Sequence, residues 1–420
     1  MKEAKVSLLG KKKWSQRVFG KLESGSMRGS MFTLTTTAMG AGCLSLPKVC
    51  MHCGLILGLI VIILAGFAAL MGMNSITKAA ERQRLYDYSK LVNRLLGANI
   101  GVMLQVIMLV YYFFIIVGYQ LLAYKALEMA TSELGVSIGD WRIYIQGTYT
   151  LVFVYPLCLL RKVTGLRFVS LLSIFCIIYI TSLITVQFTF FARENDFSEL
   201  VLFKIDKNIF SAISLSLFAF ICHLSIATIH SEMKNPIQKR MKKVNTRVVM
   251  IQLSIYFFLA GFGYASMLNN TPPVIILREP PQAFTSDSLM LIGRCMMVVI
   301  LLIAVVTLTL PFRHELRNML NRFAKIPRTS NTWHFSSTTI MVFMTMSLSI
   351  VFSDLEIILN MLGSACTLIA FLFPALVEVV NSNQPWYSFK NIFYLFIGFF
   401  LTLLGSISVV ITSLQSLETN

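Results

Sequence analysis

The chain has 420 residues, of which 56% are hydrophobic and only 13% are charged, with a mean hydropathy of +0.73 and a formal net charge of +17. Charged residues make up about 25% of an ordinary soluble domain, so a soluble globular protein is excluded. The apolar runs are continuous and do not alternate, which excludes a membrane β-barrel. These features predict an all-α membrane protein that crosses the bilayer many times.

The first segment, residues 1–28, is polar and basic, with Lys11, Lys12 and Lys13 in a row. Lysine runs occur in nucleic-acid-binding proteins, but before a membrane span they more often lie beside anionic lipid headgroups. No short apolar core with a cleavage site precedes the first span, so we expect no signal peptide. We predict a cytoplasmic tail next to the lipid bilayer, and no nucleic-acid partner.

Eleven apolar segments reach the length of about 20 residues that a spanning helix needs. Their approximate ranges are 30–50, 55–77, 99–125, 143–160, 167–191, 208–230, 247–268, 289–311, 335–352, 355–380 and 391–413. With the N-terminus in the cytoplasm, 28 of the 36 lysines and arginines fall in cytoplasmic segments, as the positive-inside rule requires. One transmembrane domain is therefore predicted over residues 29–415, and its short loops leave no room for a soluble enzyme domain.

The first span contains "TTTAMGAGCLSLP", from Thr35 to Pro47, which disfavours a continuous helix because glycine and proline both weaken helices. A broken backbone survives at membrane depth only where it faces protein or a watery cavity. Two interpretations stay open. Gly40 and Gly42 could allow close helix packing. Alternatively, the freed carbonyls and hydroxyls could hold a cation, and the freed N–H groups a carboxylate.

The next motif is "CMHC", Cys50 to Cys53, whose spacing occurs in metal sites. No second cluster of ligands accompanies it, and most of the eight cysteines lie in apolar segments, where cysteine packs as a small hydrophobe. We expect no metal and no cofactor.

The sixth span, "FSAISLSLFAFICHLSIATIHSEMKNP" from Phe210 to Pro236, has no glycine and no proline before its end. A transporter with inverted repeats should break a second span five positions after the first, but composition does not force a break here. His223 lies near the middle. It could be satisfied by a neighbouring carbonyl or hydroxyl, or it could carry protons.

Four stretches together resemble the amino acid/auxin permease family, which includes sodium-coupled neutral and vacuolar amino acid transporters. They are "TTAMGAGCLSLP" in span one, "FAFICH" with "HSEMKNP" in span six, "VTLTLPFRHELRNML" (306–320) in span eight and "NMLGSACTLIAFLFPALVEV" (360–379) in span ten. The matches are in order and cover most of the chain.

The resemblance implies a LeuT-type fold. Spans one to five (about 30–191) and six to ten (about 208–380) would form a 5+5 inverted repeat, and span eleven would be an added helix. It also implies that substrate binds where spans one and six unwind, with backbone N–H groups of span one around the carboxylate and carbonyls of span six around the amino group. The implied substrate-binding residues are Thr37, Ala38, Met39, Gly40, Ala41, Gly42, Phe218, Ala219, Phe220 and Cys222.

The resemblance also implies an ion-coupling site. Thr36 stands where sodium-coupled members have asparagine, a departure that puts sodium in question, and Thr307 and Thr309 are the candidate hydroxyls of span eight. Hydroxyls and carbonyls suit a hard cation such as Na⁺, but threonines in an apolar helix also bond back to their own carbonyls. Proton coupling would need a titratable group near mid-depth, where only His223 is found.

The sequence therefore predicts a secondary active transporter of small or neutral amino acids, coupled to H⁺ or Na⁺ and working by alternating access as a monomer. An amino-acid-sensing membrane receptor with the same pocket is the main alternative, and a channel the second. The substrate's identity and the direction of transport stay open. The sequence also does not decide between a plasma membrane and a vacuole- or lysosome-like membrane. It does not show whether the Asn269 sequon is glycosylated.

Overall fold

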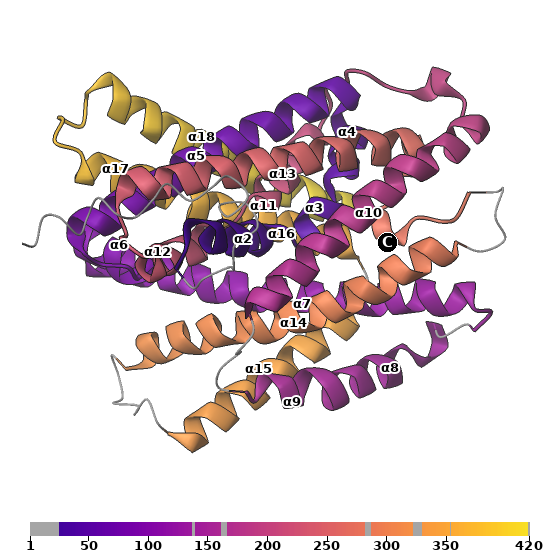
Figure 1. Cartoon of the computed structure of the whole chain (residues 1–420), viewed down its shortest axis with the longest axis horizontal. Helices are drawn as coiled ribbons and strands as arrows, with labels where there is room; N and C mark the ends of the chain where they lie inside the picture. The colour runs from indigo at the N-terminus through magenta and orange to yellow at the C-terminus, as the bar shows by residue number, and fades with distance from the viewer. Residues whose placement is uncertain are drawn as a thin grey trace, which may run out of the picture.

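All regular structure in the described part of the chain is helical. The computed structural model describes residues 25–136, 139–160, 166–281, 287–321, 330–352 and 354–418. The predicted basic tail lies outside these residues except for its last four positions. Figure 1 shows the helices gathered into one elongated bundle.

Nine helical segments among the described residues are long and apolar enough to cross a membrane. Seven consist of single helices, namely α5 (Leu55–Gln83), α7 (Ala98–Glu133), α10 (Leu166–Glu194), α13 (Gln238–Met267), α14 (Ser288–Leu320), α15 (Asn331–Val351) and α18 (Phe389–Glu418). The other two are interrupted. One joins α11 (Ile209–Ala219) to α12 (His223–Glu232), and one joins α16 (Leu355–Thr367) to α17 (Phe373–Asn381) through a π-helical turn. The chain is thus a multi-pass helical membrane protein, as predicted.

The two remaining predicted spans, 30–50 and 143–160, are divided into short pieces. The first consists of α2 (Met27–Ala38), α3 (Ala41–Leu44) and α4 (Leu46–Cys53). The second runs from α8 (Arg142–Tyr149) through a π-helical turn to α9 (Tyr155–Cys158). Each piece is too short to count as a spanning helix by itself.

One helix, α6 (Tyr88–Leu96), was not predicted from the sequence. The Asp87 side chain caps it by accepting a hydrogen bond from the Lys90 backbone N–H at 3.1 Å, which satisfies a donor that the first turn leaves free. Its buried face includes Tyr88, whose hydroxyl donates to the Ile369 carbonyl at 2.8 Å. This short amphipathic helix therefore attaches the connection between α5 and α7 to the interrupted α16–α17 segment.

The interrupted helices lie inside the bundle. In Figure 1, α2, α3, α11 and α16 occupy the middle, while α8, α9 and α15 lie at one edge. The most apolar window of α11–α12 is 72% buried, whereas that of α18 is only 28% buried. Around this interior, helix α7 packs along α14, and helix α5 packs along α13. The broken backbone is thus enclosed by protein, as a membrane requires.

Candidate functional site

The first span breaks at the predicted glycines. Helix α2 ends at Ala38, and the Met39 N–H donates to the Thr35 carbonyl at 3.0 Å. Gly40 has φ −118° and ψ −143°, far from helical values, and α3 starts directly after it. The prediction of an interrupted first span is therefore confirmed.

A second interruption in this span separates α3 from α4 at Ser45. The Ser45 hydroxyl donates to the Gly42 carbonyl at 2.8 Å, and Pro47 occupies the first turn of α4, where its missing N–H costs nothing. The Ser45 hydroxyl thus gives the Gly42 carbonyl a hydrogen-bond donor, which lipid could not provide.

The sixth span also breaks, although neither glycine nor proline lies in the interrupted part. Phe220, Ile221 and Cys222 separate α11 from α12. Two side chains from other parts of the fold support the break. The Tyr256 hydroxyl of α13 donates to the Ala219 carbonyl at 2.7 Å, and His223 Nε2 lies 3.1 Å from the Ala69 carbonyl of α5.

His223 is fully buried. Its contact with the Ala69 carbonyl fits the first of the two interpretations given in the sequence analysis, in which a neighbouring carbonyl satisfies the His223 side chain.

The two breaks touch each other. A Cβ atom added to Gly42 would lie 2.9 Å from Phe218 Cδ1 and 3.1 Å from Ala219 Cα. Only glycine permits this approach, because 3.4 Å is the lower limit of an ordinary Cβ contact. The structure therefore brings the predicted residues of spans one and six into direct contact.

Tyr119 of α7 lies against the first break and was not among the predicted site residues. A Cβ atom on Gly40 would lie 2.6 Å from the Tyr119 hydroxyl oxygen, so this hydroxyl lies against the first break. The sequence analysis named no residue of the third span as a site residue, and nothing in that apolar span distinguishes Tyr119 from its other tyrosines. Tyr119 and Phe218 together fill the space beside the two glycines.

Not all predicted substrate residues point toward this contact. The Phe220 ring packs edge-on against Tyr256, with ring centroids 5.0 Å apart, and Cys222 Sγ lies 3.7 Å from Met73 Sδ of α5. Both side chains therefore face α5 and α13. On the first span, Ala38, Met39, Ala41 and Gly42 are buried. Thr37, by contrast, is exposed.

The predicted ion-coupling threonines all bond back to their own helices. The hydroxyls of Thr36, Thr307 and Thr309 donate to the carbonyl four residues earlier at 3.1, 2.8 and 2.8 Å. Thr309 is also 3.4 Å from Cys158 Sγ of α9. Thr307 and Thr309 are two positions apart on α14, which places their side chains on nearly opposite faces.

Charged contacts join the broken helices to their neighbours at both ends. At the predicted outer end, Lys48 and His52 of α4 lie 3.5 and 3.2 Å from the Glu356 carboxylate of α16. We call these three residues the outer latch.

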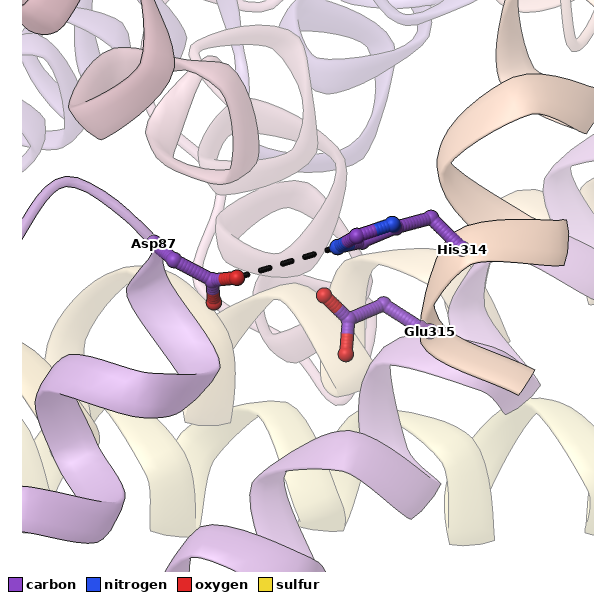
Figure 2. A group of neighbouring side chains, drawn as sticks. All are labelled: Asp87, His314 and Glu315. Atoms are coloured by element: carbon purple, nitrogen blue, oxygen red, sulfur yellow. Dashed lines mark ion pairs between the residues drawn. The ribbon is translucent and has the colours of Figure 1, made fainter. Parts of the chain in front are cut away.

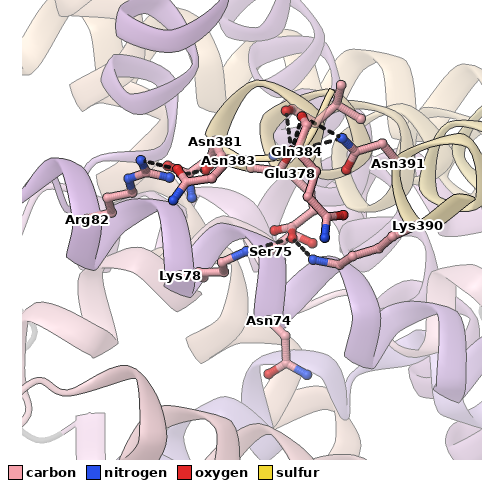
Figure 3. Close-up of polar contacts among 12 residues, drawn as sticks. Asn74, Ser75, Lys78, Arg82, Glu378, Asn381, Asn383, Gln384, Lys390 and Asn391 are labelled. Atoms are coloured by element: carbon pink, nitrogen blue, oxygen red, sulfur yellow. Dashed lines mark hydrogen bonds and ion pairs between the residues drawn. The ribbon is translucent and has the colours of Figure 1, made fainter. Parts of the chain in front are cut away.

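Figure 3 shows the predicted inner end, where the buried Glu378 of α17 pairs with Lys78 of α5 at 2.7 Å and Lys390 of α18 at 2.6 Å. We call these three residues the inner latch.

Asp87, His314 and Glu315 form a cluster in which one ligand atom of each lies within 4.8 Å of the others (Figure 2). Such a set could hold a metal ion. However, Lys90 Nζ already lies 3.0 Å from the Asp87 carboxylate, and Ser89 donates to Glu315 at 3.1 Å. Burial would raise the pKa of Asp87, but hydrogen bonds from His314, Lys90 and Ser89 lower it well below its usual range. The cluster ties α6 to the end of α14.

A family model for transmembrane amino acid transporter proteins matches residues 23–416. Vacuolar amino acid transporter 6 of Saccharomyces cerevisiae is 25% identical over 71% of this chain and 68% of its own length. Sodium-coupled neutral amino acid transporter 4 of Rattus norvegicus is 22% identical over 82% of this chain and 76% of its own. The chain spans less than half the length of two other relatives, from Plasmodium berghei (44%) and Toxoplasma gondii (43%).

Solved structures show the same fold. The transporter MhsT, crystallised with L-phenylalanine, superposes with a TM-score of 0.60 at 14% identity, over 94% of this chain and 99% of that one. A manganese transporter of Eremococcus coleocola gives a TM-score of 0.55 at 13% identity, over 91% and 86%. Both are LeuT-fold transporters, so the predicted LeuT-type fold is confirmed.

Proposed function

Because this chain belongs to the transmembrane amino acid transporter family, we propose that it is a secondary active transporter of small or neutral amino acids. The observation that carries the proposal is the contact between the two helix breaks, where Gly42 lies against Phe218 and Ala219. Both interrupted backbones are enclosed by protein, at the place where a fold of this kind can bind a zwitterion.

The proposed chemistry uses backbone groups. The N–H groups of Ala41 and Gly42 open the short helix α3, and they would bind the substrate carboxylate, whereas the Gly40 N–H already donates to the Ala38 carbonyl at 2.9 Å. The carbonyls that end α11, at Phe218 and Ala219, would accept hydrogen bonds from the substrate ammonium group. Tyr119 and Phe218 limit the space beside the break, which favours small substrates.

Substrate entry requires a rearrangement, because Tyr119 and Phe218 fill the space beside the glycines. We propose that the outer latch and the inner latch open in turn, giving alternating access. Each latch joins helices that belong to different parts of the bundle. Neither latch blocks the backbone groups themselves.

We further propose that transport is coupled to Na⁺ or H⁺. A threonine hydroxyl that donates to its own helix keeps its oxygen lone pairs, so Thr36 and Thr307 retain the capacity to bind a cation. His223 is the proposed group for proton coupling. The name of the rat relative, sodium-coupled, supports Na⁺ as the coupling ion, and the name of the yeast relative, vacuolar, supports a vacuole-like membrane as the location. A plasma membrane is the other proposed location.

Ligand-induced stabilisation of the purified protein tests the site directly. We expect alanine or another small neutral amino acid to raise the unfolding temperature, and we expect its methyl ester and its N-acetyl derivative to do so at least tenfold less effectively. Each derivative removes one of the two charges that the breaks would bind. Equal stabilisation by an amino acid and both derivatives would contradict backbone recognition of the zwitterion.

A further inference from the structure

One exposed face of α13 carries a row of uncompensated positive charges. Lys239, Lys242, Lys243 and Arg247 are exposed and line a surface groove together with Thr246. Their spacing of three and four residues places them on a single face of the helix. None of these four basic side chains makes an ion pair within the described part of the chain. We call the four the basic stripe.

The position of the stripe makes its charge costly. Helix α13 begins at Gln238, and the N-terminal end of a helix carries a partial positive charge that repels cations. No acidic residue lies in its first turn. The Glu81 carboxylate accepts the Gln238 backbone N–H and supplies one negative charge. Four basic residues remain without a counter-charge, and an external anion would relieve their repulsion.

The same face of α13 becomes apolar one turn further along. Met250, Phe257 and Phe258 continue the exposed row, with 60%, 49% and 51% of their surface accessible. This part of α13 belongs to a membrane-spanning helix, so these side chains face the lipid chains. A ligand that covers the whole face must therefore have an anionic head next to a hydrocarbon tail.

We propose that this face of α13 binds an anionic phospholipid, whose phosphate-bearing headgroup lies on the basic stripe and whose acyl chain lies along Met250 and Phe257. A soluble protein or a nucleic acid would match the charge but not the apolar half, which lies in the hydrocarbon. Basic clusters directly beside a spanning helix attract anionic headgroups by about 1 kcal/mol per residue.

The opposite face of α13 connects this surface to the interior. Tyr256 holds the Ala219 carbonyl at the break of span six, and Asn245 donates to the Asn74 side chain of α5 at 3.0 Å. A lipid bound to the stripe therefore stabilises a helix that supports the interrupted span. Lipid binding at this face does not depend on amino acid transport.

Native mass spectrometry of the full chain tests the proposal. The protein is purified in detergent with equal amounts of phosphatidylserine and phosphatidylcholine, and the retained lipids are counted. We expect preferential retention of phosphatidylserine. The K242Q/K243Q/R247Q variant should lose this preference by more than tenfold, because about 1 kcal/mol per charge corresponds to about a fivefold change each. If that variant does not fold, K242Q alone should lose about fivefold.

Three controls make the result specific. The charge-conserving K242R/K243R/R247K variant should keep the preference, and so should R193Q/K207Q, which removes two exposed charges elsewhere. Unchanged retention in the triple glutamine variant would overturn the proposal, as would an equal loss in R193Q/K207Q. Displacement of the lipid by glycerophosphoserine, which has no acyl chains, at a similar concentration would show that the occupant is a soluble anion and would also overturn it.

Discussion

Replacing Gly42 by alanine should separate the two helix breaks. The new Cβ atom would lie 2.9 Å from Phe218 Cδ1 and 3.1 Å from the Ala219 backbone, and an ordinary contact needs at least 3.4 Å. Phe218 can shift by part of this deficit, but Ala219 is backbone and carries the carbonyl that Tyr256 holds. Overpacking of this kind costs about 1–3 kcal/mol.

The assay compares G42A with G261A. A Cβ atom added to Gly261 of α13 would have no other atom within 4 Å, so alanine there should be neutral or slightly stabilising. We expect G42A to lower the unfolding temperature by several degrees relative to G261A and to reduce amino acid uptake in proteoliposomes by at least tenfold. If G42A matched G261A in both measurements, the contact between the breaks would not control stability or transport.

Three further changes probe the surroundings of the breaks. Y119F removes the hydroxyl beside Gly40; we expect a severalfold change in the KM of uptake with little change in unfolding temperature, and an unchanged KM would remove Tyr119 from the site. E356Q weakens the outer latch by about 1 kcal/mol, so hydrogen exchange in α4 should become severalfold faster while α12 is unaffected. D87N keeps a side-chain oxygen that can cap α6 but removes the charge that faces Lys90 and His314, and it should cost up to about 1 kcal/mol at pH 7. Because the folded-state pKa of Asp87 is lowered, its stabilisation is present above the unfolded pKa of about 4 and is lost as the pH falls. The difference in thermal stability between D87N and the unmodified protein should therefore begin to shrink as the pH falls below about 4 and should vanish only below the lowered folded-state pKa. A difference that stays constant as the pH falls would contradict the assignment.

The composition of the sequence was sufficient to predict the first break, whereas the second break was implied only by the family resemblance. Gly40, Gly42 and Pro47 interrupt span one through their own backbone chemistry, which is a local property. The break of span six depends on Tyr256 and His223, which reach carbonyls of other helices. Hydrogen bonds between different helices can be identified only from the packed structure, not from the sequence of one span.

The residues of the candidate site could also be predicted only in part from the sequence. The resemblance to a known family placed spans one and six together, and Gly42 does contact Phe218. It did not reveal the direction of side chains, so Phe220 and Cys222 were grouped with Phe218 although they face α5 and α13. Helix α6 was missed because its nine residues carry no long apolar run.

Uptake into proteoliposomes under imposed gradients is the decisive test of the proposed transport of amino acids. The purified chain is reconstituted, and a panel of labelled amino acids is offered with a sodium gradient, with a pH gradient, or with neither. We expect small neutral amino acids to accumulate above their external concentration under one of the two gradients and only to equilibrate without it. Saturable binding with no uptake under any gradient would contradict a transporter and would favour an amino acid sensor.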